Sequence, residues 1–236
     1  MNCDAIARYY ELLERISFGR YLERSRFAFL GVVQSSKRAI LCGGGDGRFL
    51  VRLLSMSSAV EVDFVDLSQT MVRLAERRVS ALGPSFRERV AFHCGDVREF
   101  RLRPDSYDLI VTNFFLDCFT QEELPRVVDH LATSGGQKTR WVVSDFCEAE
   151  GLINSLWTRA VIRGLYAAFR LTTGLRVTRL PDYASALRRT GYALRSERAS
   201  LGGLLHSSLW EYCGRPPLST QSQSIRAATH LSPPAS

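Results

Sequence analysis

The chain has 236 residues, of which 45% are hydrophobic and 23% charged, which suits one α/β domain with a sizeable core. Its net charge of +7 permits nucleic-acid binding, but only Lys37 and Lys138 of its 31 basic residues are lysine, and the arginines are scattered. Nucleic acid is therefore an unlikely partner. No apolar run approaches the ~20 residues of a membrane span, and the N-terminus lacks a signal-peptide pattern.

The six cysteines form no C-x-x-C pair, and several lie in apolar runs where cysteine acts as a small hydrophobic residue. This usage indicates reduced thiols in the cytoplasm and argues against a disulfide framework or a zinc site. We expect a soluble cytoplasmic protein without a bound metal.

Residues 1–36 are predicted to form an N-terminal helical cap, because apolar residues recur at helical spacing, with a bend or break at Gly19. Two roles are open for this cap. It can simply pack on the core, or it can form a lid over a cofactor with aromatic cover from Tyr9, Tyr10, Phe18 or Tyr21. Packing is favoured for most of these positions.

An apolar strand at residues 39–42 runs into Gly43-Gly44-Gly45-Asp46-Gly47, and an amphipathic helix begins at Arg48. Strand, glycine turn and helix open many nucleotide-binding α/β units, because glycine lets a ligand lie against the backbone. A dinucleotide site prefers G-x-G-x-x-G, which would require glycine at position 48. The spacing found is G-x-G-x-G, so a nicotinamide dehydrogenase is disfavoured.

The next predicted strand, residues 60–65, ends in Asp66. A carboxylate at this carboxyl edge can accept hydrogen bonds from both hydroxyls of a ribose. Asp66 could instead cap the helix predicted from Gln69, but Ser68 is the better N-cap and would leave Asp66 free for a ligand.

Further predicted strands and helices complete the main pattern. A strand at residues 89–94 precedes Asp96 and Val97, and a strand at 106–115 carries Asn113 and Phe114 at its tip. A helix at 121–131, a turn at 133–136 and a strand at 140–144 follow. This alternation predicts a doubly wound, mostly parallel, Rossmann-like sheet of seven strands. Residues 191–212 read as an antiparallel hairpin at its edge.

The ordered motifs over residues 38–213 resemble those of class I S-adenosylmethionine-dependent methyltransferases, of the small-molecule type that includes quinone-precursor methyltransferases. The resemblance implies that S-adenosylmethionine binds along Gly43, Gly45 and Gly47. It also implies that Asp66 and Leu67 meet the ribose, and that Asp96 and the Val97 amide meet adenine. Asn113 and Phe114 would lie beside the methyl group.

Two positions depart from the resembled pattern. The family often has an acidic residue two positions before the first glycine, where this chain has Leu41, so the cofactor's amino group needs another partner such as Asp46 or a backbone carbonyl. Methyltransferases acting on amino groups of nucleic acids or glutamine carry two prolines after the Asn113 position. This chain has Phe114-Phe115 there, which weakens those substrates.

Residues 37–213 are thus predicted to form the methyltransferase domain, with a helical insertion near 151–180 and a disordered tail at 214–236. The insertion either packs on the core or covers the substrate, for example through Trp157 and Tyr166.

In-line methyl transfer mainly requires alignment and exclusion of water. A general base is needed only for a protonated nucleophile. Asp117, Asp145 and His206 are candidates, with no basis for choosing among them. The leading expectation is a methyltransferase with a small-molecule acceptor. A non-catalytic cofactor-binding protein and an RNA or protein methyltransferase are the alternatives. The acceptor and the oligomeric state stay open.

Overall fold

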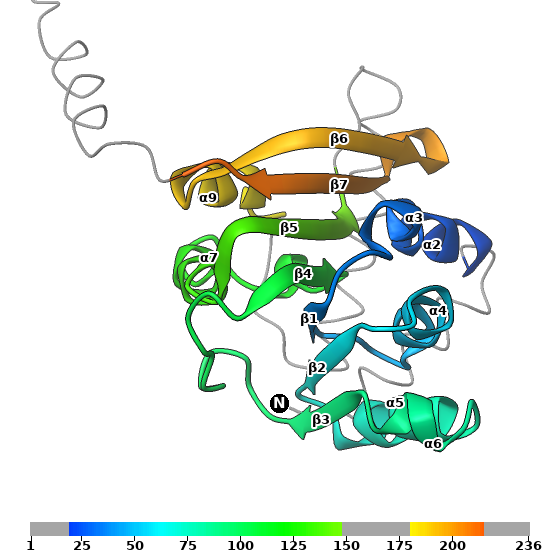
Figure 1. Cartoon of the computed structure of the whole chain (residues 1–236). Helices are drawn as coiled ribbons and strands as arrows, with labels where there is room; N and C mark the ends of the chain where they lie inside the picture. Colours follow the sequence, from blue (N-terminus) through cyan, green and yellow to red (C-terminus); the bar gives the residue numbers. More distant parts are fainter. Residues whose placement is uncertain (1–18, 148–179, 215–236) are drawn as a thin grey trace, which may run out of the picture.

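The computed structural model describes residues 19–147 and 180–214 (Figure 1). The predictions for residues 4–18, for most of the 151–180 insertion and for the tail beyond Gly214 lie outside the described residues. They include the aromatic cover from Tyr9, Tyr10 and Phe18.

A seven-stranded sheet in the order β3-β2-β1-β4-β5-β7-β6 organises the described chain. Its first five members are parallel, whereas β7 runs antiparallel to both β5 and β6. The strands are β1 Arg38–Cys42, β2 Glu61–Asp66, β3 Val90–Cys94, β4 Tyr107–Asn113, β5 Gly135–Phe146, β6 Tyr192–Ser200 and β7 Leu205–Tyr212. The predicted fold class, a mostly parallel sheet with an antiparallel terminal hairpin, is confirmed.

Helices cover both faces of this sheet, as right-handed crossovers between parallel strands require (Figure 1). One apolar layer contains α3, α4 and α5, and the other contains α7 and α9. The helices are α2 Gly19–Arg26, α3 Leu30–Val33, α4 Arg48–Met56, α5 Gln69–Ser80, α6 Pro84–Arg87, α7 Leu124–Ala132 and α9 Tyr183–Arg189, with 3-10 turns η2 Leu116–Cys118 and η3 Leu201–Gly203.

The turn predicted at 133–136 is wrong in its second half, because β5 already begins at Gly135, opposite Tyr107. A Cβ added at Gly135 would lie 2.5 Å from the Tyr192 hydroxyl, so this glycine is required by close packing. Thr139 Oγ1 donates to the Tyr107 carbonyl at 2.6 Å and accepts from the Gly136 amide at 2.7 Å, which holds the irregular start of the strand.

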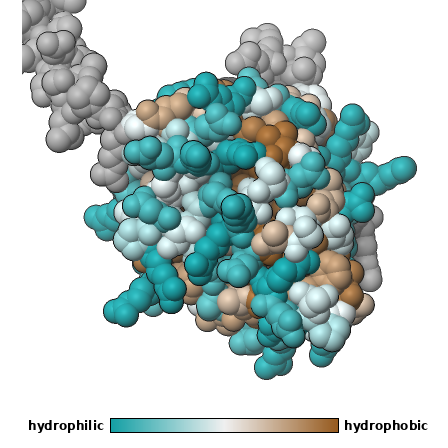
Figure 2. Space-filling view, in the orientation of Figure 1, coloured by the Kyte–Doolittle hydropathy of each residue, from teal (hydrophilic) through white to brown (hydrophobic). Residues whose placement is uncertain are grey.

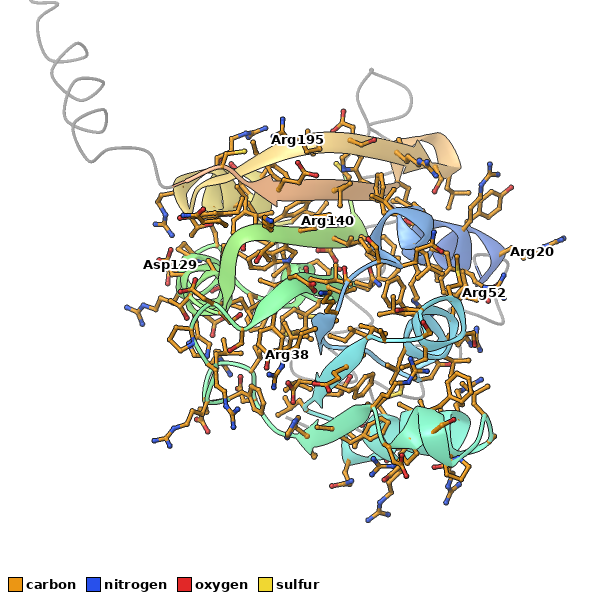
Figure 3. The ribbon with its side chains drawn as sticks, in the orientation of Figure 1. Arg20, Arg38, Arg52, Asp129, Arg140 and Arg195 are labelled. Carbon is orange, nitrogen blue, oxygen red and sulfur yellow. The ribbon has the colours of Figure 1, made fainter. Side chains whose placement is uncertain are left out.

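Polar and apolar patches are mixed over the face shown in Figure 2. Charged side chains project from many elements, as the labelled Arg20, Arg52, Asp129 and Arg195 illustrate (Figure 3). Within residues 19–147 and 180–214, no helix has both the length and the apolar content to cross a bilayer.

Candidate functional site

The glycine loop joins β1 to α4 at the carboxyl edge of the sheet. Gly43, Gly45 and Gly47 have φ values of 62°, 59° and 81°, a region that side-chain-bearing residues rarely adopt. The Gly43 amide donates to the Val65 carbonyl at 2.9 Å, which ties the loop to the end of β2. At Gly45 an added Cβ would meet nothing within 4 Å, so the loop has open space on that side.

The Asp66 carboxylate joins the glycine loop to the helix after β2. Its Oδ2 accepts the Gly45 amide at 3.0 Å and its Oδ1 accepts the Ser68 amide at 2.9 Å. Ser68 Oγ accepts the Met71 amide at 3.4 Å, which confirms Ser68 as the N-cap. Asp66, however, is not free as expected, because each oxygen already accepts one backbone N–H.

Asp66 nevertheless retains capacity for a ligand, because each carboxylate oxygen has a second lone pair. Burial raises its pKa to about 6, outweighing the opposing effect of the Ser68 and Gly45 amides. The neighbouring Leu67 side chain is 40% exposed at the same edge of the sheet.

Asp96 follows β3, and its carboxylate is held by Arg98. The Arg98 Nη2 lies 2.6 Å from Asp96 Oδ2, and Nε lies 3.0 and 2.9 Å from the two oxygens. This pairing lowers the pKa of Asp96. Arg98 was not among the predicted site residues. Its position two residues after Asp96 was the one sign in the sequence that the two side chains could pair. Val97, the next predicted contact, is buried.

The tip of β4 carries Asn113 and Phe114. Asn113 is 8% exposed, and its Oδ1 has no hydrogen-bond partner among the described residues. Phe114 adopts a φ of 53°, and its amide donates to the Ser144 carbonyl at 2.5 Å. Its ring centroid lies 5.5 Å from that of Phe146, and the Arg26 guanidinium lies 5.8 Å from the same ring.

The three candidate general bases lie at two different places in the fold. Asp145, near the end of β5, and Asp117, in η2, come together, and their interaction contributes to the pKa shifts of both carboxyls. His206 instead faces Tyr183, whose hydroxyl lies 3.3 Å from Nδ1, and Glu197, which lies 3.3 Å from Nε2.

Asp46 was a candidate to bind the cofactor's amino group, because position 41 holds leucine instead of an acidic residue. The Asp46 carboxylate, however, already has arginine partners. It pairs with Arg48 at 2.8 Å and with Arg78 at 3.0 Å. Leu41 itself is buried in the core.

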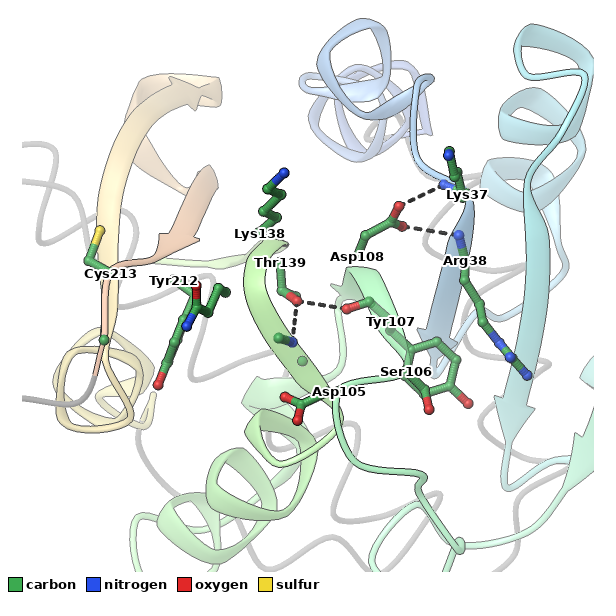
Figure 4. A pocket seen from close by; sticks show the side chains of 14 residues that line it. Lys37, Arg38, Asp105, Ser106, Tyr107, Asp108, Lys138, Thr139, Tyr212 and Cys213 are labelled. Atoms are coloured by element: carbon green, nitrogen blue, oxygen red, sulfur yellow. Dashed lines mark hydrogen bonds between the residues drawn. The ribbon is translucent and has the colours of Figure 1, made fainter.

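A separate cavity of about 1080 Å³ lies at the opposite edge, around the amino ends of β1, β4 and β5 (Figure 4). Lys37 and Lys138, the only lysines of the chain, both line it. Asp108 accepts the backbone amides of Lys37 and Arg38 at 2.8 and 3.0 Å, which fixes the entry to β1. This cavity is remote from the glycine loop, which follows the carboxyl end of β1.

Comparison with known proteins complements this geometry. A family profile described as a methyltransferase domain matches residues 40–135. The human N-terminal Xaa-Pro-Lys N-methyltransferase 1 is 31% identical over 163 residues, covering 64% of this chain and 71% of that protein. The chain belongs to the S-adenosylmethionine-dependent methyltransferases.

Two further proteins resemble the chain, one in sequence and one in fold. Polyamine aminopropyltransferase 2 of Bacillus cereus is 30% identical over 127 residues, covering 49% of this chain but only 35% of that protein. An O-methyltransferase family protein from Burkholderia thailandensis superposes with a TM-score of 0.65 and 17% identity, covering 87% of this chain and 59% of the other. The chain thus spans about a third of the aminopropyltransferase, and the second likeness concerns the fold alone.

Proposed function

We propose that this protein binds S-adenosylmethionine at the carboxyl edge of the sheet and transfers its methyl group to a small molecule. The observation that carries the proposal is the Asp66 carboxylate, which bridges the Gly45 and Ser68 amides beside three glycines of positive φ. Membership of the methyltransferase family supports it.

The residues present fit this cofactor. Gly43, Gly45 and Gly47 would let it lie against the backbone, and the space beside Gly45 is open. The remaining lone pairs of Asp66 would accept the ribose hydroxyls, next to Leu67. The Asp96 carboxylate and the Val97 amide would meet adenine, and Asn113 and Phe114 would flank the methyl end.

When bound, S-adenosylmethionine supplies a methyl carbon attached to a positively charged sulfur. The chain's own task is to align the acceptor and to keep water away. Aromatic rings just beyond β4 suit both roles, since Phe114 packs against Phe146 and Phe115 packs against Phe119. The Phe114 face would also favour a nearby cation.

Isothermal titration calorimetry with S-adenosylhomocysteine tests the cofactor part of the proposal. Asp66→Ala should weaken binding at least tenfold, because hydrogen bonds to a charged group contribute about 1.5–3 kcal/mol each. Asp129→Ala, which removes an exposed carboxylate of α7, is the matched control and should bind normally. A wild-type protein that binds neither the donor nor S-adenosylhomocysteine would refute the proposal.

A labelled-methyl transfer assay tests the catalytic part. Binding without transfer to any small metabolite would favour the alternative of a non-catalytic cofactor-binding protein. This alternative is worth testing because Leu41, a core residue, stands where the family often has an acidic residue.

A second candidate function is methylation of a protein amino terminus. It rests on the 31% identity to the human N-terminal Xaa-Pro-Lys N-methyltransferase 1 over 71% of that protein. Transfer of label to a peptide beginning Ala-Pro-Lys, and to no small metabolite, would favour this candidate over the first.

A further inference from the structure

The cavity at the amino edge of the sheet is distinct from the proposed cofactor site. It lies around the amino ends of β1, β4 and β5 (Figure 4), whereas the glycine loop and Asp66 lie at the carboxyl ends of β1 and β2. Its volume of about 1080 Å³ is close to the upper end of the range for small-molecule sites, roughly 300–1,000 Å³. The proposed methyl transfer does not use this cavity, which is large enough for a ligand of its own.

The lining of this cavity carries a net positive charge. Its charged residues are three cations and two carboxylates, namely Lys37, Arg38 and Lys138 against Asp105 and Asp108. The Asp108 carboxylate already accepts the Lys37 and Arg38 backbone amides at 2.8 and 3.0 Å. Within residues 19–147 and 180–214, neither lysine forms an ion pair. Both ammonium groups are therefore available to an anionic ligand.

The two lysines of this cavity occur in a chain that otherwise uses arginine. They are the only lysines among 31 basic residues, and both line the same cavity. Their side chains extend on the same side of the sheet, with Asp108 between them (Figure 4). Lys37 precedes β1 and Lys138 lies in β5, with β4 between the two strands, so their backbones are about 10 Å apart. Two long, flexible lysine side chains can close this gap over one ligand.

Two buried hydrogen-bond donors beside the cavity have no acceptor. Arg38 Nε and Tyr192 Oη both lack a partner among the described residues. The Arg38 guanidinium lies 5.9 Å from the centroid of the Tyr107 ring. Gly135 pairs in register with Tyr107, and a Cβ added at Gly135 would lie 2.5 Å from Tyr192 Oη. Since Tyr107 and Gly135 line the cavity, both donors border it. Buried polar groups are normally paired, so this edge of the sheet lacks acceptors.

The chemistry of these groups defines the class of ligand. Ammonium and guanidinium groups only donate hydrogen bonds, so the ligand must supply acceptors and negative charge. A carboxylate has one charge and two oxygens in a plane, which suits a single arginine fork. A phosphate group has three terminal oxygens and up to two charges, so it can meet two ammonium groups that approach from different strands. The rings of Tyr107 and Tyr212 line the same cavity and offer apolar surface to an organic part of the ligand.

We propose that this cavity is a second ligand site, which binds a phosphorylated small molecule through the ammonium groups of Lys37 and Lys138. The phosphate group lies between the two lysine side chains, and the Arg38 guanidinium adds a third positive charge to the lining. The inference goes beyond the proposed function, because this site shares no residue with the proposed cofactor site.

The first test is calorimetry on the full chain at about 50 mM salt, because screening weakens contacts between exposed charges. The probes are ribose 5-phosphate and pyrophosphate, compared with citrate and ribose, each with and without saturating S-adenosylhomocysteine. We expect a Kd below about 1 mM for a phosphate probe in both conditions, at least tenfold weaker binding of citrate, and none of ribose. Citrate that binds as tightly as the phosphate probes overturns the phosphate assignment. Absence of saturable binding by either phosphate probe overturns the site itself.

The second test uses the double variant Lys37→Gln/Lys138→Gln. Both side chains are exposed, so the fold should be kept, which thermal melting verifies. The variant should bind the phosphate probe at least tenfold more weakly, because two charge-assisted hydrogen-bonding groups are lost. Lys37→Arg/Lys138→Arg keeps the charge and should bind more tightly than the glutamine variant.

The matched control is Arg52→Gln/Arg73→Gln, which removes the same charge from exposed positions of α4 and α5. Its affinity for the phosphate probe should stay within about twofold of the wild type. A glutamine variant of the lysines that binds the probe as tightly as this control shows that the phosphate binds elsewhere, and overturns the inference.

The outcomes for the two sites are independent. Lys37→Gln/Lys138→Gln should bind S-adenosylhomocysteine like the wild type. A wild-type protein that binds the phosphate probe but not S-adenosylhomocysteine refutes the proposed function and leaves this inference standing. A protein that binds S-adenosylhomocysteine but no phosphate probe does the reverse.

Discussion

At the scale of single residues, the glycines of the loop are required for different reasons. Gly47 has a φ of 81°, and a Cβ there would lie 2.6 Å from Ala75 Cβ and 2.7 Å from its Cα. Gly45 has a φ of 59° but faces open space. Conformation constrains both positions, whereas packing against α5 constrains only Gly47.

Replacing these two glycines should therefore give unequal losses. Gly45→Ala should lower the free energy of unfolding by about 1 kcal/mol, the cost of placing a side chain in the left-handed region. Gly47→Ala should lower it by about 3 kcal/mol, because the overlap with the α5 backbone adds to that cost. Urea denaturation of both variants measures the difference. Equal losses would show that α5 shifts freely away from the loop.

The pKa of Asp66 predicts a pH-dependent stability. Its folded-state pKa is about 6, against 3.8 in the unfolded chain, so the folded state binds the proton more tightly. The stabilisation from this group is full below pH 4 and is lost as the pH rises through 6.

Asp66→Asn removes this proton linkage. When the pH is raised from 4 to 7.5, the difference in unfolding free energy between Asp66→Asn and the wild type should shift by about 2–3 kcal/mol in favour of the variant. The cost of the substitution itself cancels in this comparison. Denaturant titrations of both proteins at the two pH values measure this change. Parallel pH profiles would contradict the raised pKa.

At the scale of elements, serine hydroxyl groups fasten α2 to the antiparallel end of the sheet. Ser25 Oγ lies 2.6 Å from Ser207 Oγ, and the Ser25 carbonyl accepts the hydroxyls of Ser207 at 2.9 Å and Ser144 at 3.3 Å. All three serines are buried. The last turn of α2 is thus fixed next to the Phe114 ring, over which Arg26 lies.

Ser207→Ala should lower the free energy of unfolding by about 1–2 kcal/mol, because a buried hydroxyl partner of Ser25 is lost. Ser55→Ala is the control, since its exposed hydroxyl bonds only to the Val51 carbonyl of its own helix, and should cost less than about 0.5 kcal/mol. Chemical denaturation distinguishes them. A loss at Ser207 no larger than at Ser55 would mean that the serine cluster does not fasten α2.

Local chemistry explains what could be predicted from the sequence at this scale. The glycine loop, Ser68 as a cap and the position of Asp66 follow from short-range rules of turns and strand ends. The meeting of Asp117 with Asp145 does not, because it depends on how η2 folds back over β5. Likewise, the hairpin of β6 and β7 was predictable, but the insertion of β7 between β5 and β6 depends on non-local pairing.

At the scale of the whole molecule, the positive charge is dispersed. Several arginines are neutralised in ion pairs, such as Arg87 with Glu76, Arg189 with Asp129 and Arg195 with Glu211. The labelled arginines in Figure 3 come from different elements.

Binding to nucleic acid should accordingly be weak. For a 20-nucleotide single-stranded RNA at 150 mM salt we expect a Kd above about 10 µM, in the range of non-specific contacts. Fluorescence anisotropy at two salt concentrations measures it. Submicromolar binding that falls steeply with salt would instead favour an RNA acceptor.

The insertion of β7 has a consequence for folding on the ribosome. Its residues are made last among the described strands, yet they separate β5 from β6, and the Ser25–Ser207 contact spans 182 positions. Until Leu205–Tyr212 have left the exit tunnel, β5 has an unpaired edge and β6 has no neighbour to join. Such an edge invites association between nascent chains, so chaperone protection during synthesis should matter more for this protein than for one whose sheet closes in chain order.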